Sequence, residues 1–353
     1  MTLNHRKSAF ITLGSFLKQF STTEITKNNS VPYNDLFFDR FTSAIEQAGL
    51  YNGWFSRENI LFACESWSDA LSEENLSKWL NNYDFSAIVP KKVAIIMAGN
   101  IPLVGFHDFL SVLISGHEVI VKQSSNDTKL LPILAEYLQV VSACFEQKIN
   151  FSSEKLPEFD AVIATGSDNT ARYFEYYFGQ KPHIIRRNRN SVAVLTGTET
   201  KEELEALGED IFRYYGLGCR NVSKLFVPEG YDFDAFFKAI YSYHPIVNED
   251  KYANNYDYNK AVYLMSLIPL LENGFLMLKE DTQYASPIAT LFYESYNNLE
   301  ELKERLMADS DKIQCIVGKN HFANQVSFGH TQKPQLWDYA DGVDTLLFLT
   351  NLR

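Results

Sequence analysis

The stretch KVAIIMAGNIPLVGFHDFLSVLISGHEVIVKQS, from Lys92 to Ser124, places a long apolar segment between two short β-rich segments. The first β-rich segment ends at Gly99 and Asn100, which are residues typical of turns. The middle segment is apolar nearly all round, as a buried helix is. The pattern therefore predicts a strand, a helix and a second strand, which is the repeating unit of parallel sheets.

The same alternation continues along the chain. A helix pattern with Asp127 as its expected N-cap comes next, and Thr200 with Glu203 has the spacing of a capping box at the start of another helix. Residues 1–90 read instead as helices and loops. Strands alternating with helices indicate an α/β fold with a mostly parallel sheet, whose ligands bind beyond the carboxyl ends of its strands. Further strands are predicted at 159–167, 181–187, 191–197, 224–228, 289–295 and 312–318.

Composition excludes some classes of protein. A chain of 353 residues is long enough for two domains, and its formal net charge of −12 argues against nucleic acid as the main partner. The four cysteines are far apart, which is typical of reduced thiols in a cytosol. No apolar segment approaches the roughly 20 residues of a membrane helix, and the N-terminus lacks a secretory signal. We therefore expect a cytoplasmic protein without a membrane span.

The loop YYGLGCRNVSKLFVP, from Tyr214 to Pro228, carries the main candidate for chemistry. Cys219 lies between Gly218 and Arg220, just past the predicted helix that begins after Thr200 and for which Gly216 is the natural stop. A thiolate is a strong nucleophile, and Gly218 leaves room for a substrate. The alternative is a small hydrophobic residue in a turn. For the other cysteines, which lie in apolar or amphipathic runs, a place in the core is expected.

Several polar residues stand at predicted strand ends. Asn100 follows the first strand and could donate to a developing oxyanion or serve only as a turn residue. Lys122 ends the second strand, where it could contact a nucleotide or solvent. The segment Thr165-Gly166-Ser167 ends the third strand and begins a helix, so it could hold a phosphate, or Ser167 and Asp168 could be N-caps.

A basic run interrupts this acidic chain at Arg186-Arg187-Asn188-Arg189. It is either a solvated loop or a site for the phosphates of a coenzyme, because guanidinium groups pair well with phosphate. The histidines show no spacing of metal ligands, so no metal site is predicted.

The segments AGNIPL, VIVKQSS, ATGS and GLGCRN, followed by SPIATLFYE, occur in an order that resembles the aldehyde dehydrogenase superfamily. GLGCRNVSKLFVP and DYADGVDTLLFL resemble its acyl-CoA reductase family of the LuxC type. The resemblance covers residues 92–353 and implies an aldehyde dehydrogenase-like fold. It implies a helical N-terminal part of the cofactor domain at 1–90, a Rossmann-like NAD(P)-binding domain at 91–192, a catalytic domain at 193–330 and a C-terminal segment at 331–353.

The resemblance also implies roles for single residues. Cys219 corresponds to the nucleophile, and Asn100 to the asparagine that shares the oxyanion hole with the nucleophile's backbone N–H. The resemblance implies a substrate site at Arg186, Gly218 and Arg220. It places the cofactor on Lys122, Ser124, Thr165, Gly166, Ser167 and Gln283.

Three departures from the superfamily pattern refine this expectation. Arg186 takes the place of the glutamate that activates water in hydrolytic members, which favours a thiol such as CoA as the exchanging group. Ser125 replaces a glutamate that bonds the adenosine ribose, which favours NADPH, with NADH as the alternative. Gln283, four residues before Pro287, replaces a glutamate that holds the nicotinamide ribose; its amide can still hydrogen-bond but carries no charge.

The resemblance therefore implies reduction of an acyl-CoA or acyl-protein thioester to an aldehyde through an acyl-cysteine. The alternatives are an aldehyde dehydrogenase, an acyl-phosphate reductase or a non-catalytic scaffold. Superfamily members use a C-terminal strand between subunits, and DTLLFLTNL, residues 344–352, is expected to be such a strand in a homo-oligomer.

Overall fold

The computed structural model describes residues 2–319, 322 and 325–352, without the side chain of Asp168. The chain divides into two compact units. The first unit comprises Met1–Arg187 and Gln335–Arg353, and the second comprises Asn188–Pro334. The sequence predicts domain boundaries after residues 192 and 330. These boundaries remain predictions, because the division into two compact units does not test them.

The first unit contains an entirely parallel five-stranded sheet in the order β3-β2-β1-β4-β5. Residues alternate between its two faces, as the pleat of a strand requires. Val93 and Ile95 face one core, while Ala94 and Ile96 face the other. The strands are β1 Lys92–Ile96, β2 Glu118–Lys122, β3 Ile149–Phe151, β4 Ala161–Thr165 and β5 His183–Arg186.

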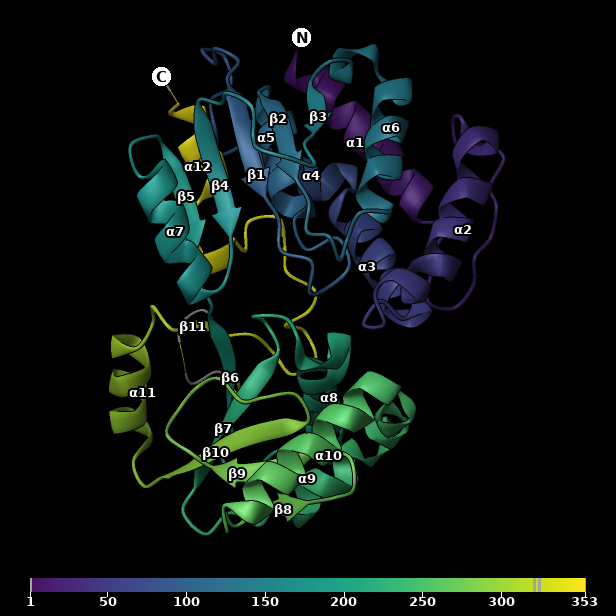
Figure 1. Ribbon diagram of the computed structural model, residues 1–353. Coiled ribbons are helices and arrows are strands. Elements are labelled where there is room, and N and C mark those ends of the chain that lie inside the picture. The colour runs from purple at the N-terminus through teal and green to yellow at the C-terminus, as the bar shows by residue number, and fades with distance from the viewer. Residues whose placement is uncertain (1, 320–321, 323–324, 353) are drawn as a thin grey trace. The chain divides into compact units, whose positions relative to one another are not determined.

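Helices cover both faces of this sheet (Figure 1). The larger core joins the sheet to the N-terminal helices and to α5, which is buried along nearly its whole length, as its apolar sequence predicts. The smaller core lies under α7. The helices are α1 Leu3–Leu17, α2 Asn34–Tyr51, α3 Arg57–Ala70, α4 Glu73–Leu80, α5 Phe106–Ser115, α6 Leu130–Val141, α7 Asp168–Phe178 and α12 Thr345–Thr350.

The second unit is built on a six-stranded sheet in the order β11-β6-β7-β10-β9-β8. All neighbouring strands are parallel except β8 and β9, which are antiparallel. The strands are β6 Asn190–Val194, β7 Val222–Pro228, β8 Leu271–Glu272, β9 Met277–Glu280, β10 Thr290–Tyr296 and β11 Ile313–Val317.

One face of this second sheet packs on α8 and α9, and the other packs on α11. The predicted capping box at Thr200 and Glu203 is confirmed, since each side chain accepts a hydrogen bond from the other residue's backbone N–H. The helix therefore begins where the sequence places it. The helices are α8 Lys201–Phe212, α9 Asp234–Ala239, α10 Asp250–Met265 and α11 Leu299–Ala308.

The C-terminal segment differs from its prediction. The expected strand at 344–352 is wrong, because this segment forms helix α12. Asp344 caps the helix by accepting a hydrogen bond from the backbone N–H of Leu347 at 2.8 Å. Leu346 and Leu349, three residues apart, are both buried in the core of the first unit. The argument for an oligomer from a terminal strand is therefore lost, and a homo-oligomer stays a prediction from the resemblance alone.

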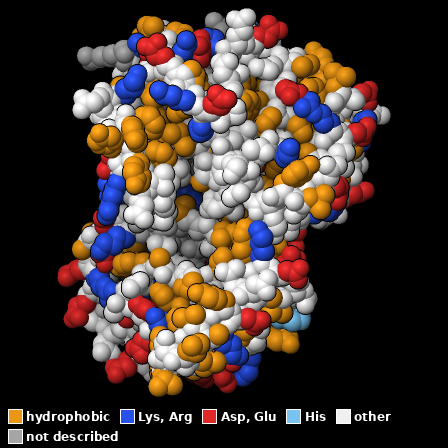
Figure 2. Space-filling model, viewed as in Figure 1, with side chains coloured by type: hydrophobic (Ala, Val, Ile, Leu, Met, Phe, Trp, Pro, Cys, Tyr) orange, Lys and Arg blue, Asp and Glu red, His pale blue; other side chains and the backbone are white. Residues whose placement is uncertain are grey.

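On the face drawn in Figure 2, apolar side chains gather over the end of α10 and over β8. Leu264, Met265 and Leu267 are among the exposed large side chains there. In the part of the chain that the structure describes, every helix is too short or too polar to span a membrane. The described residues also contain no group of three or more His, Cys, Asp or Glu side chains arranged to hold a metal ion.

Candidate active site

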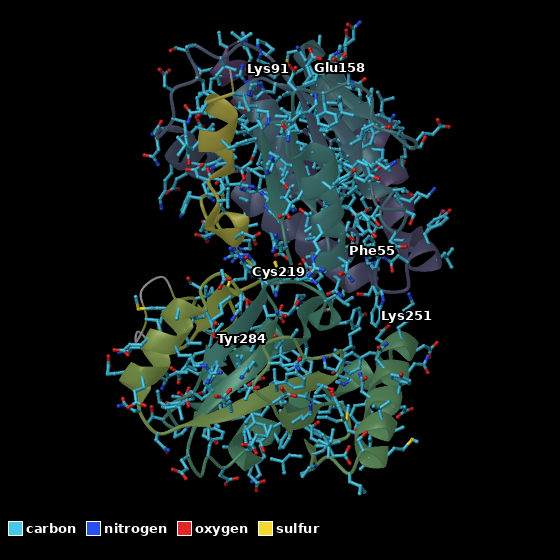
Figure 3. The ribbon with its side chains drawn as sticks, turned by 60° about the vertical axis from the view of Figure 1, so that its left-hand side comes forward. Phe55, Lys91, Glu158, Cys219, Lys251 and Tyr284 are labelled. Carbon is cyan, nitrogen blue, oxygen red and sulfur yellow. The ribbon has the colours of Figure 1, made fainter. Side chains whose placement is uncertain are left out.

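Cys219 lies in the loop between α8 and β7, at the end of the second sheet where β7 begins (Figure 3). Its side chain is exposed, whereas Cys64 and Cys315 are buried and Cys144 is partly buried. The structure therefore separates Cys219 from the other cysteines in the way that an accessible nucleophile requires.

The segment before Cys219 has an unusual backbone. Helix α8 ends at Phe212, and Tyr214, Tyr215 and Gly216 then take φ values of 55°, 58° and 76°. The sequence placed the end of the helix at Gly216, so the helix is shorter than predicted. Two consecutive left-handed tyrosines cost conformational energy, and the buried rings of both tyrosines hold them in place.

Asn221 ties the cysteine loop to the end of α8. Its side-chain oxygen accepts a hydrogen bond from the N–H of Gly218 at 2.8 Å. Its side-chain nitrogen donates to the carbonyls of Asp210, Ile211 and Arg213 at 3.1, 3.3 and 2.7 Å. Asn221 is buried, so these bonds are shielded from water. The sequence analysis did not single out this residue, although its place two residues after the candidate nucleophile was a signal.

Replacing Asn221 with alanine should lower kcat by about 10²-fold, because it releases the peptide next to the nucleophile from its anchor. The rate of Cys219 alkylation by iodoacetamide should change as well, which a loss of general stability alone would not produce in folded protein. The measurements are steady-state kinetics and peptide mass spectrometry. Asn255→Ala is the matched control, since the side-chain amide of Asn255 donates to the carbonyl of Lys251 within helix α10 of the same unit. Unchanged kcat and alkylation in Asn221→Ala would contradict this role.

Two further contacts surround the loop. The hydroxyl of Ser191 donates to the carbonyl oxygen of Cys219 at 3.0 Å. Arg220, predicted to contact substrate, is half-buried, and its Nη1 lies 3.3 Å from the sulfur of Cys315 on β11. This contact within the second unit draws the guanidinium toward β11.

Gln283 is exposed in the loop between β9 and β10. The backbone carbonyl groups of the residues before and after Gln283 accept hydrogen bonds from side chains of β7. Lys224 Nζ donates to the carbonyl of Thr282 at 2.9 Å, and Ser223 Oγ donates to that of Tyr284 at 2.7 Å. The Lys224 side chain is fully buried against Glu294 at 2.6 Å, and this burial lowers the pKa of Lys224. The backbone around Gln283 is thus fixed while its side chain faces outward.

In the first unit, the candidate cofactor residues stand at or just beyond the carboxyl ends of the strands. Lys122 ends β2, and its ammonium donates to the carbonyls of Ser153 and Glu154. Thr165 ends β4, and Ser167 Oγ accepts the N–H of Thr170 at 3.4 Å, so Ser167 is confirmed as an N-cap. The structure thus gathers these side chains at one edge of the sheet, where ligands bind in open α/β sheets.

The turn after β1 packs closely on the segment after β2. A Cβ on Gly99 would lie 2.6 Å from Ser124 Cβ, so only glycine fits there. Asn52, from the helical N-terminal part, donates to the carbonyl of Asn126 at 3.3 Å. Asn100 follows Gly99 and is exposed. The N-terminal helices thus contribute directly to the shape of this edge.

Asp127 is not the N-cap predicted from the sequence, because α6 begins at Leu130. Its Oδ2 instead accepts the N–H of Leu103 at 3.3 Å, and Leu103 has a φ of 55°. The carboxyl thus stabilises a strained turn in the segment that follows Asn100. Burial raises the pKa of Asp127 to about 6.

A raised carboxyl pKa means that the folded protein binds this proton more tightly than the unfolded chain does. Stability should therefore fall as the pH rises from about 4 to about 6. Asp127→Asn removes the charge and keeps an acceptor for Leu103. It should raise the free energy of unfolding by about 2–3 kcal/mol at pH 8 and change it little at pH 4. Urea unfolding at both pH values measures this, and a gain of equal size at both would refute it.

Arg186, which the resemblance assigns to the substrate site, lies in a buried ion pair. It ends β5 and is 7% exposed. Its guanidinium pairs with both carboxylate oxygens of buried Asp108 on α5, with Nη2 at 2.8 Å from Oδ1. Nη2 also donates to Thr345 Oγ1 of α12 at 3.1 Å. These contacts make Arg186 a link between β5, α5 and α12.

The neighbouring arginines of the basic run also have partners. Arg187 pairs with Glu175 on α7 at 2.5 Å. In the second unit, Arg189 Nη1 donates to the carbonyl of Ser310 at 3.1 Å. The sequence left two interpretations of this run open, a solvated loop and a phosphate site. The contacts of Arg187 and Arg189 within their own units favour neither interpretation.

A model of the LuxC acyl-CoA reductase family matches residues 40–241. No curated protein matches.

Among solved structures, aldehyde dehydrogenase 21 from Physcomitrella patens is similar with a TM-score of 0.63 and 14% identity, over 91% of this chain and 74% of that one. KauB, an aldehyde dehydrogenase from Pseudomonas aeruginosa, gives 0.62 and 14%, over 92% and 77%. An indole-3-acetaldehyde dehydrogenase solved with NAD+ gives 0.63 and 14%, over 90% and 72%. At these identities the likeness shows the fold, which confirms the predicted aldehyde dehydrogenase-like architecture.

Proposed function

This chain belongs to the LuxC acyl-CoA reductase family, and we propose that it reduces an acyl thioester to an aldehyde with a nicotinamide cofactor. The observation that carries the proposal is the exposed thiol of Cys219 on a loop anchored by buried Asn221. A reactive group held on a fixed backbone is what nucleophilic catalysis requires. The acyl-CoA donor and the preference for NADPH are the finer parts of the proposal.

In the proposed reaction, the Cys219 thiolate attacks the carbonyl carbon of the thioester. A bond forms between that carbon and Sγ, the bond to the CoA sulfur breaks, and CoA leaves as its thiolate. The backbone N–H of Cys219 and the side-chain amide of Asn100 are the proposed donors to the transient oxyanion, and one such donor contributes about 10²–10³ in rate. When bound, the reduced nicotinamide would supply the hydride that the acyl carbon receives. Breaking the bond to Sγ then releases the aldehyde and restores the thiolate.

The first unit offers residues that fit a dinucleotide. Lys122, Ser124 and the turn at Thr165, Gly166 and Ser167 stand at or just beyond the carboxyl ends of β2 and β4. Gly166 is tightly packed, since a Cβ there would lie 3.0 Å from Thr170. Ser125 carries no charge where a glutamate would repel a 2′-phosphate, which favours NADPH. In the second unit, exposed Gln283 is proposed to hydrogen-bond the cofactor.

Arg186 supports transfer to a thiol rather than hydrolysis. It stands where hydrolytic relatives of the superfamily carry a glutamate, and the buried carboxylate that it meets, Asp108, has both oxygens bound to its guanidinium. Because this carboxylate is buried and both of its oxygens already accept hydrogen bonds from the guanidinium, it is poorly placed to take a proton from water. An acyl group on Cys219 should therefore persist until a thiol or a hydride removes it.

The test is NADPH and NADH oxidation with acyl-CoAs of graded chain length, an acyl phosphate and an aldehyde, together with mass spectrometry of Cys219. We expect turnover with acyl-CoA, and an acyl-Cys219 adduct when the cofactor is withheld. Faster turnover of the acyl phosphate would favour an acyl-phosphate reductase. Rapid thiol-free oxidation of the aldehyde to acid would favour an aldehyde dehydrogenase. An absence of any turnover or adduct would favour the scaffold alternative.

A further inference from the structure

The first unit holds a cavity of about 780 Å³ that no part of the proposed reaction uses. Pro90, His117 and Lys148 line it, and they precede strands β1, β2 and β3. The cavity therefore lies at the amino ends of the strands, whereas Lys122 and Thr165 lie at the carboxyl ends. Strands of five residues separate the two edges by roughly 15 Å. Figure 3 labels Lys91 at this end of the unit.

Arg6 of α1 is the charged group built into the cavity wall. It is 6% exposed, and its Nε donates to the carbonyl of Ile114, a neutral acceptor, at 2.7 Å. A Cβ on Gly116 would lie 3.2 Å from Arg6 Nη1, so the guanidinium lies directly against that turn. Burial lowers the pKa of Arg6, which means that its positive charge is poorly solvated. An anion in the cavity would offset this cost.

The other basic groups of the wall contribute less charge. Lys148 Nζ is paired with Glu118 at 2.7 Å. His117 accepts the N–H of Lys91 on Nδ1 at 3.1 Å, and its Nε2 lies 3.0 Å from the carbonyl of Leu349, so Nε2 carries the proton of a neutral ring. Burial also lowers the pKa of His117. Among the described residues that line the cavity there is no Asp or Glu.

The lining also includes apolar side chains such as Leu113 and Phe145, beside hydroxyl groups such as that of Ser115. Cys144 also faces the cavity, with its sulfur 2.6 Å from Ser142 Oγ. A buried cation beside apolar side chains is complementary to a molecule with one negative end and an apolar body. We propose that this cavity binds a small carboxylate with an apolar body, such as a medium-chain fatty acid, with its carboxylate on the guanidinium of Arg6.

Cys144 provides a direct reporter of occupancy that needs no enzymatic activity. Octanoate should slow the alkylation of Cys144 by iodoacetamide in the full chain, in a saturable manner, as measured against the protein without octanoate. Arg6→Met should raise the concentration for half-protection by at least about tenfold, because it removes a charge-assisted hydrogen bond. Lys18→Met is the matched control: it removes an exposed positive charge at the end of the same helix, outside the cavity lining.

Two further ligands test the two parts of the proposed chemistry. Octanol has the apolar body without the charge, and inorganic phosphate has charge without the body, so both should protect Cys144 far less than octanoate does. Protection by either one equal to that by octanoate would overturn the proposal, as would an absence of protection by octanoate.

A second variant keeps the proposal testable if Arg6→Met does not fold. Ser86 is an exposed residue of the lining, and Ser86→Trp places an indole in the cavity without altering the buried charge. It should weaken protection by octanoate to a similar extent. Protection unchanged in a folded Ser86→Trp protein would overturn the proposal. Because neither Cys219 nor a candidate cofactor residue lines the cavity, failure here is distinguishable from failure of the proposed reaction.

Discussion

Replacing Cys219 with alanine is expected to lower the rate of NADPH-dependent acyl-CoA reduction by at least about 10⁴-fold. The sulfur is the atom to which the acyl group is transferred in the proposed reaction, and no other atom of the loop can take its place. The measurement is the loss of NADPH absorbance with an acyl-CoA in excess. Mass spectrometry should show at the same time that the variant no longer forms an acyl-enzyme.

Two controls separate chemistry from folding in this experiment. Cys144→Ala removes a partly buried thiol of the first unit and should leave the rate close to that of the wild type. NADPH binding by Cys219→Ala, followed by cofactor fluorescence, should be retained because the candidate cofactor residues at the sheet edge are unchanged. Substantial reduction of acyl-CoA by Cys219→Ala would remove the nucleophile from the proposal.

The largest expected effect on stability comes from Arg186. Arg186→Met leaves the buried carboxylate of Asp108 without its bidentate partner, and loss of one member of a buried ion pair costs about 3–5 kcal/mol. The variant also loses the hydrogen bond to Thr345 that joins β5 to α12 within the first unit. Urea unfolding followed by circular dichroism should show this loss.

The double variant Asp108→Leu with Arg186→Met distinguishes a structural role from a substrate contact. Replacing both partners of a buried pair by apolar residues of similar size is often neutral, so most of the lost stability should return. If Arg186 acts only through its ion pair, the folded double variant should keep the wild-type KM for acyl-CoA. A large rise in KM with restored stability would instead support the contact with substrate that the resemblance implies.

Much of the fold was readable from the sequence because the relevant interactions are local. Strands β1 and β2 with the buried helix α5 between them, the capping box at Thr200 and the cap at Ser167 all depend on residues a few positions apart. Strand β3 was missed because only Ile149 among its three residues is buried, which is too little for a pattern. The segment at α12 was misread because a short apolar run has no period that separates strand from helix.

The candidate site was predictable only in part. A cysteine between a glycine and an arginine, outside any apolar run, indicated an exposed loop thiol, and the structure exposes it. The anchoring by Asn221 was not predicted, because it depends on a reversal of the chain. That reversal places Gly218 and the last carbonyls of α8 within hydrogen-bond distance of the Asn221 side-chain amide. The helix end itself moved from Gly216 to Phe212, since the buried tyrosines favour a left-handed turn over another helical turn.

The sequence by itself determined the α/β architecture, the order of the strands along the chain and the loop that carries Cys219. Tertiary structure decided what the charged and polar side chains do. Arg186 meets Asp108 across 78 positions, and His117 meets Leu349 across 232. Hydrophobic periodicity and helix capping depend on residues a few positions apart, so the sequence shows them directly. The partner of a buried charge can lie anywhere along the chain, so no local sequence pattern indicates it.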